Sequence, residues 1–160
     1  MRAVDHDHRG HGRGTPFDAA VLAHDERTLR RRLLTLRSGA ELLVDLPATV
    51  ALQTGDVLVL EDGRLVEIIA AEEALYTVRG RDARHVMELC WHIGNRHLPC
   101  QIIHEEDGNW RVLIGRDPVI GTMLEGLGAT VSEVSGPFSP IRGAYSGEGH
   151  AHGHHHPHHD

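Results

Sequence analysis

Short apolar runs separated by turn signals fill the first half of the chain, a pattern typical of β-strands. One run, residues 41–46, meets Pro47, which lacks the N–H of a sheet ladder, so we expect the strand to end there. Asp62-Gly63 between two further apolar runs predicts a hairpin. With about five such strands, residues 16–72 are predicted to form a small all-β domain, either a sandwich or an open barrel.

The second half of the chain begins with a strand-like run and then changes to helical periodicity. Val86, Cys90 and Ile93 recur at the spacing of one helix face. Asp82 can accept a hydrogen bond from a first-turn N–H, so it is the expected start of this helix. Gly94 tolerates a positive φ and is the expected end.

A second helix is predicted after Asp117-Pro118, because proline at the first helical position loses no hydrogen bond. Together with the helices, the strand-like runs give the order β-α-β-β-α-β of a ferredoxin-like unit over residues 73–146. Those runs are residues 75–79, 100–105, 110–114 and 129–134. The expected fold class is therefore α+β, with an all-β domain preceding a ferredoxin-like domain.

Both ends of the chain lack apolar periodicity and are rich in histidine. Residues 1–15 are predicted to be disordered, either as a solvated leader or as a weak metal-collecting arm carrying His6, His8 and His11. Residues 147–160 are predicted to be a flexible tail, in which glycine and alanine separate seven histidines. These are His150, His152, His154, His155, His156, His158 and His159. Imidazole suits nickel, zinc and copper, so the tail is a predicted site for a transition metal.

Composition narrows the possible functions. The formal charge is -7 at pH 7, and no basic stripe with interleaved aromatics is present, which argues against a nucleic-acid partner. No apolar run reaches the roughly 18 residues of a membrane span, and no signal-peptide pattern opens the chain. Cys90 and Cys100 do not make a disulfide scaffold. We therefore expect a protein of the reducing cytoplasm that does not bind membranes.

His97 is the histidine whose backbone is most tightly prescribed, since it follows a predicted helix end and precedes Pro99. It is either a structural residue or a metal ligand, and one imidazole alone cannot hold a metal. In a two-fold homodimer both copies of His97 can meet at the axis, with tail histidines completing the site. His92 and His104 are predicted to be surface residues, with a secondary ligand role as the alternative. Cys100 is a weaker candidate ligand.

The block 94–102, Gly-Asn-Arg-His-Leu-Pro-Cys-Gln-Ile, resembles the GNRH-x-P-x-Q-I signature of the UreE family of urease accessory proteins. The resemblance runs from about Pro16 to the histidine-rich end and is carried by several segments in the family's order. These are residues 45–47, 55–58, 61–68, 127–131, 137–140 and 143–145.

This resemblance implies an N-terminal β domain that engages partners and a C-terminal metal-binding domain that forms a head-to-head homodimer. It also implies that His97 is a shared nickel ligand and that nickel passes to the GTPase UreG and the urease apoprotein complex. Some members of the family carry His-Asp-His before the second helix. Here the segment reads Arg116-Asp117-Pro118, so no auxiliary site is expected there, and the tail histidines are the natural replacement.

The expected function is that of a nickel-binding metallochaperone that delivers Ni²⁺ for assembly of the urease active site, with Zn²⁺ or Cu²⁺ also able to bind in vitro. The alternative is a histidine-rich protein that stores or buffers nickel or zinc, in which the tail is the function. An enzyme is not expected, because the chain has no H-E-x-x-H motif, nucleophile elbow or P-loop.

Overall fold

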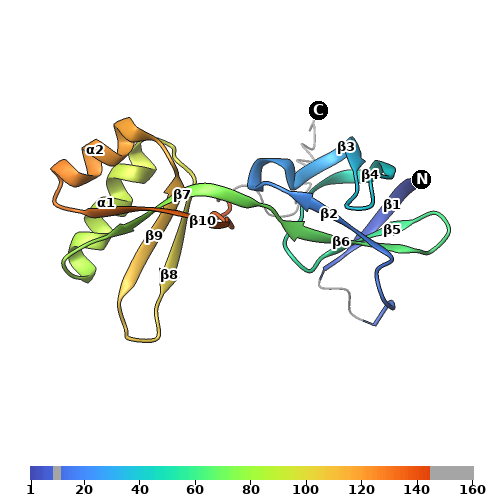
Figure 1. Cartoon of the computed structure of the whole chain (residues 1–160), viewed down its shortest axis with the longest axis horizontal. Helices are drawn as coiled ribbons and strands as arrows, with labels where there is room; N and C mark the ends of the chain where they lie inside the picture. Colours follow the sequence, from blue (N-terminus) through green and yellow to red (C-terminus); the bar gives the residue numbers. More distant parts are fainter. Residues whose placement is uncertain (9–11, 145–160) are drawn as a thin grey trace, which may run out of the picture.

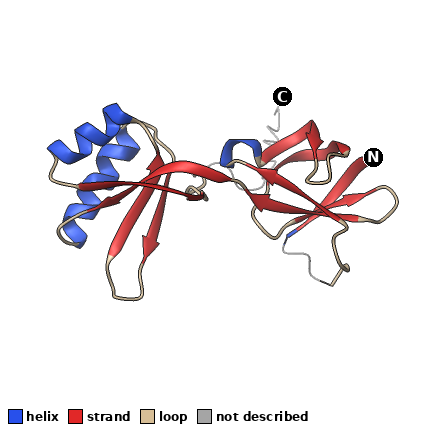
Figure 2. Cartoon of the chain, viewed as in Figure 1, coloured by secondary structure: helices blue, strands red, loops and turns tan. Residues whose placement is uncertain are grey.

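The computed structural model describes residues 1–8 and 12–144 of the 160-residue chain. They form two lobes joined by a long strand ribbon (Figure 1). The first lobe is built mainly from strands, with the short 3₁₀ helix η2 (His24–Glu26), and the second packs two helices on one face of a sheet (Figure 2). This agrees with the predicted α+β class. None of the described helices is long and apolar enough to cross a membrane.

The first lobe holds a six-stranded sheet in the order β2-β6-β5-β1-β4-β3. The β1/β4 and β2/β6 pairs are parallel, and the other pairs are antiparallel. The backbone N–H of Arg37, just past β3, donates to Ala19 of β2 at 2.8 Å, so the two sheet edges curl toward each other. The strands are β1 (Arg2–Asp7), β2 (Asp18–Leu22), β3 (Thr28–Thr35), β4 (Glu41–Ala51), β5 (Val57–Leu60) and β6 (Leu65–Ala70).

The core of this lobe follows from strand alternation. Leu42, Val44 and Leu46 occupy alternate positions of β4 and are at most 1% exposed, because successive side chains of a strand point to opposite faces. They pack with apolar residues from the other five strands into one cluster. The predicted all-β unit is confirmed, and its curled sheet resembles the open-barrel alternative.

Two predictions for this lobe are wrong. The leader is not disordered over its first residues, because β1 lies inside the sheet, with Ala3 fully buried and Arg2 paired with Asp45 at 2.8 Å. The strand before Pro47 does not stop there, since β4 continues to residue 51. The β3–β4 register shifts beside this proline, which agrees with the confinement of proline to edges and bulges.

The second lobe has the strand order β10-β7-β9-β8, and every neighbouring pair is antiparallel. The two helices connect β7 to β8 and β9 to β10, so the predicted ferredoxin-like arrangement is confirmed. Its elements are β7 (Glu72–Arg79), α1 (Ala83–Asn95), β8 (Cys100–His104), β9 (Trp110–Gly115), α2 (Pro118–Gly126) and β10 (Thr130–Pro137).

Both helices begin where the capping residues predict. Asp82 accepts a hydrogen bond from the N–H of His85 at 2.8 Å and starts α1. Asp117 accepts from the N–H groups of Val119 and Ile120 and starts α2, with Pro118 in its first turn. Each cap satisfies N–H groups that a helix start leaves without intrahelical partners.

A set of contacts ties the lobes together. A guanidinium N–H of Arg27 donates to the carbonyl of Phe138, whose side chain is only 1% exposed. The ring of Phe138 packs edge-on against His24, with centroids 4.9 Å apart. His24 in turn lies 2.7 Å from a carboxylate oxygen of Glu73. These contacts create the cleft beside the candidate metal ligand.

Candidate metal site

The last turn of α1 ends in a Schellman motif with His97 at the position usually held by glycine. The N–H of Leu98 donates to Ile93 at 3.3 Å, and the N–H of His97 donates to Gly94 at 2.9 Å, which are the two bonds of that motif. His97 has φ of 56°, the single positive value among the described non-glycine residues. The prediction that Gly94 takes the positive φ is wrong, because Gly94 lies inside α1.

The left-handed conformation costs a residue other than glycine about 1–2 kcal/mol, although histidine adopts it more readily than most. Half-buried Leu98 packs on the core of the second lobe and holds the chain in this path. The side chain of His97 is left exposed at the end of the helix. A strained residue with an accessible imidazole is a candidate functional position.

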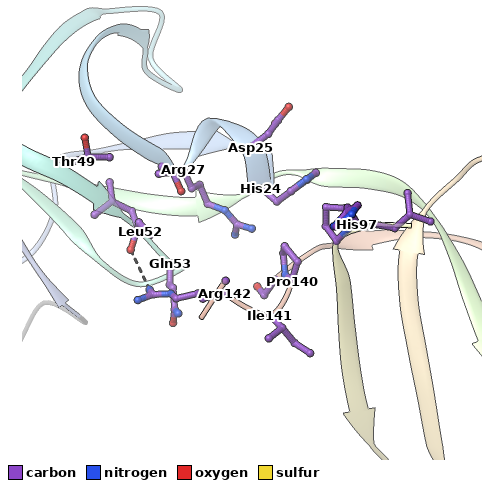
Figure 3. A pocket seen from close by; sticks show the side chains of 16 residues that line it. His24, Asp25, Arg27, Thr49, Leu52, Gln53, His97, Pro140, Ile141 and Arg142 are labelled. Atoms are coloured by element: carbon purple, nitrogen blue, oxygen red, sulfur yellow. Dashed lines mark hydrogen bonds between the residues drawn. The ribbon is translucent and has the colours of Figure 1, made fainter. Parts of the chain in front are cut away.

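The segment that leads to the tail lies beside His97. Backbone N–H groups of Ser139 and Ile141 donate to the Gln101 side chain at 2.9 Å and to the Cys100 carbonyl at 2.8 Å. Pro140, Ile141 and His97 line the same cleft (Figure 3). The structure describes the chain up to residue 144 here, so the predicted ligands between His150 and His159 lie outside the described residues.

The other predicted histidines do not join His97. His92 packs edge-on against Trp91 in α1, and His104 stacks on Trp110 with ring centroids 4.1 Å apart. His6 and His8 contact each other in the first lobe, and His11 lies outside the described residues. Over residues 1–8 and 12–144, no group of three or more His, Cys, Asp or Glu is placed to hold a metal.

Two histidines that the sequence analysis did not single out have defined positions. His85 is 4% exposed, and its two ring nitrogens lie within hydrogen-bond distance of the Arg81 N–H and the Leu127 carbonyl, so its role is structural. His24 shares the cleft with His97 but belongs to the other lobe (Figure 3). No local sequence signal reveals His24, because the packing of the lobes brings it there.

The two cysteines pack on the core beside the His97 loop, both half-buried. Burial raises the pKa of the Cys90 thiol and of the Cys100 thiol. Metals bind the thiolate, so burial disfavours either residue as a ligand. Cys90 fills the core position that its helical spacing predicts.

The segment Arg116-Asp117-Pro118 has structural roles. Arg116 donates to the carbonyl of Val134 at 2.9 Å and lies 3.6 Å from a carboxylate oxygen of Glu133. Asp117 is committed to capping α2. Neither arrangement presents a metal ligand.

Each of the two lobes matches a domain of a known protein family. Residues 2–71 match the N-terminal domain of the UreE urease accessory protein, and residues 73–160 match its C-terminal domain. The chain belongs to the UreE family. The resemblance of the His97 block to that family is thereby confirmed, and the role of the chain lies in urease maturation.

Relatives within the UreE family are similar over most of the chain. The urease accessory protein UreE of Mesorhizobium japonicum is 63% identical over 136 residues, which cover 85% of this chain and 67% of the relative. The UreE protein of Rhizobium meliloti is 52% identical over 141 residues, 88% of each chain. The UreE protein of Brucella anthropi is 57% identical over 86% of this chain and 77% of its own.

Proposed function

We propose that this UreE-family chain is a homodimeric nickel metallochaperone that binds Ni²⁺ and delivers it for assembly of the urease active site. The observation that carries the proposal is His97 at the end of α1. A strained position that favours glycine holds an accessible imidazole, and the chain segment leading to seven further histidines lies beside it.

The dimer proposal is supported by the surface of α1. Met87 and Trp91 are 66% and 63% exposed and lie one turn apart on the helix that ends near His97. Residues four apart share a helix face, so they form an apolar patch. A second copy of the chain packed on this patch through a two-fold axis buries both residues and brings the two His97 rings toward each other.

The ligand set of the proposed site combines two His97 imidazoles with tail histidines. A nickel ion on His97 needs such donors, because the described residues place no other cluster of ligands around it. Several equivalent imidazole ligands along one segment can replace one another on the metal, which suits a protein that releases it. Zn²⁺ and Cu²⁺ also favour imidazole, and they are expected to compete in vitro.

Delivery requires partners, and we propose the GTPase UreG and the urease apoprotein complex, with the first lobe as the partner-binding unit. We place the protein in the cytoplasm, where Cys90 and Cys100 stay reduced. The proposed role involves no catalytic turnover by this chain.

A nickel titration of a variant without residues 147–160 separates delivery from storage. For a metallochaperone we expect the number of nickel ions bound to fall while one weakened site per dimer remains, because the two His97 imidazoles are retained and only the tail ligands are lost. For a storage protein the many weak sites of the tail are the function. Calorimetry of the full chain and the truncated chain, both as purified dimers, measures the stoichiometry and the affinities. Loss of all nickel binding on truncation would favour storage.

A further inference from the structure

The cleft between the lobes has a volume of about 750 Å³. Such a volume lies within the range of small-molecule sites in proteins. Both lobes contribute polar side chains to its lining, with His97 and Arg142 from the second lobe and its outgoing segment. The first lobe contributes His24, Arg27, Thr49 and Gln53 (Figure 3).

Arg27 is a buried cation with unused hydrogen-bond donors. It is 4% exposed, and one terminal nitrogen donates to the carbonyl of Phe138. Its Nε and Nη1 atoms are buried and have no hydrogen-bond partner among the described residues. Glu73 attracts the guanidinium, but its two oxygens are engaged by the ring and the backbone N–H of His24. Burial lowers the pKa of Arg27, and the attraction of Glu73 acts in the opposite direction.

Arg142 adds a second guanidinium to the lining of the cleft. It is exposed, donates to the carbonyl of Ala51 at 3.1 Å, and has no carboxylate partner within the described part of the chain. Asp25 is the acidic residue among the described lining residues, and its carboxylate points away from the arginines in Figure 3. The cleft therefore concentrates positive charge in a chain whose formal charge is -7.

We propose that this cleft binds a small polycarboxylate anion, with carboxylate groups on Arg142 and Arg27 and its remaining oxygens facing His97. The planar guanidinium fork matches a carboxylate with two parallel hydrogen bonds. Arg142 is open to solvent and makes the first contact. The second carboxylate is placed on the buried, unpaired donors of Arg27, and this contact requires the side chains that cover them to move.

The inference rests on the proposed nickel function for its biological meaning. A polycarboxylate can hold a divalent cation with some oxygens while others bind arginine. The cleft then presents a nickel chelate to His97 on the neighbouring wall, and the metal can move from carboxylate oxygen to imidazole. The ligand class is thus a small carboxylate chelator of nickel.

Calorimetric titration of the metal-free full chain with citrate tests the anion site alone. At pH 8 the tail imidazoles are largely neutral, so they contribute little to anion binding. We expect citrate to bind the wild type and to bind Arg142→Gln about tenfold or more weakly, since a charge-assisted fork is lost. Arg27→Gln should weaken binding in the same direction, and it also removes a contact between the lobes.

Arg31→Gln is the matched control, because Arg31 is 72% exposed in its side chain and lies on β3 away from the cleft lining. It should bind citrate like the wild type. Absence of citrate binding at millimolar concentrations, or equal binding by Arg142→Gln and Arg31→Gln, would overturn the proposal. Inorganic phosphate should bind more weakly than citrate, and tighter phosphate binding would overturn the carboxylate assignment.

A His97→Asn variant separates this inference from the nickel function. It should retain binding of metal-free citrate, because Arg27 and Arg142 are intact. With residues 147–160 removed from both proteins, so that the tail histidines cannot bind the nickel, the chain that keeps His97 should bind nickel citrate more tightly than citrate, and His97→Asn should lose that difference. If it keeps the difference, His97 is not the nickel ligand, whereas loss of metal-free citrate binding in Arg142→Gln would still support the anion site.

Discussion

Replacing His97 by asparagine should remove the tightest nickel site and leave the fold intact. Asparagine tolerates the left-handed conformation that His97 adopts at φ of 56° but supplies no imidazole. Each dimer loses two ligands at once, so we expect the nickel affinity of the tight site to fall by more than about 100-fold. Competition with a nickel-sensitive chelator dye measures the affinity.

Two further variants control this experiment. His104→Asn removes an exposed histidine of the same lobe that stacks on Trp110, and it should leave the tight site unchanged. His97→Gly should also lose the tight nickel site. Its free energy of unfolding should be about 1 kcal/mol higher than that of the wild type, because glycine relieves the left-handed strain. Retention of the tight site by both His97 variants would refute the proposed role of this residue.

Replacing Trp91 by glutamate should convert the proposed dimer into a monomer. Trp91 and Met87 form the exposed apolar patch on α1, and in a two-fold contact every substitution acts twice. A central tryptophan at an interface contributes on the order of 2–4 kcal/mol, so the dimer dissociation constant should rise by at least about 1,000-fold. Sedimentation equilibrium measures the dissociation constant.

Leu33→Glu is the control for the loss of the dimer. Leu33 is 57% exposed on β3 of the first lobe, so the same change in charge should leave the dimer intact. Trp91→Glu should also lose the tight nickel site, since a monomer presents a single His97. A dimer that survives Trp91→Glu with unchanged affinity would show that this face of α1 is not the interface.

Local sequence signals were sufficient to predict the fold of the second lobe. Asp82 and the pair Asp117-Pro118 specify where the helices begin, and the apolar spacing of Val86, Cys90 and Ile93 specifies which face of α1 is buried. The strand order follows, because a β-α-β-β-α-β chain has few ways to pack two helices on one sheet. Sequence reasoning works here since each element carries its own start and period.

Local signals failed where distant residues decide the structure. The strand Arg2–Asp7 buries Ala3 as its one fully buried side chain, and it forms because β4 and β5, some 40 to 60 residues away, pair with its backbone. At the end of α1, the tolerance of glycine for positive φ led to the prediction that Gly94 adopts it. The anchoring of Leu98 on the core moves that conformation to His97.

The cleft beside His97 could not be predicted from the sequence either. His24, Arg27 and Arg142 are ordinary polar residues in the sequence, and Arg27 and Arg142 are separated by more than 100 positions. They share a cleft because Phe138, at the end of β10, packs into the junction of the lobes. His97 could be proposed as a metal ligand from a motif, whereas its surroundings required the packing of the two lobes.

X-ray absorption at the nickel edge, on full-length dimer loaded with a single nickel ion per dimer, tests the shared His97 site most directly. We expect nitrogen and oxygen ligands with the outer-shell scattering of imidazole, and a weaker imidazole signal in His97→Asn because two imidazole ligands are lost. Sulfur in the first shell, or a spectrum that His97→Asn leaves unchanged, would contradict a shared His97 site.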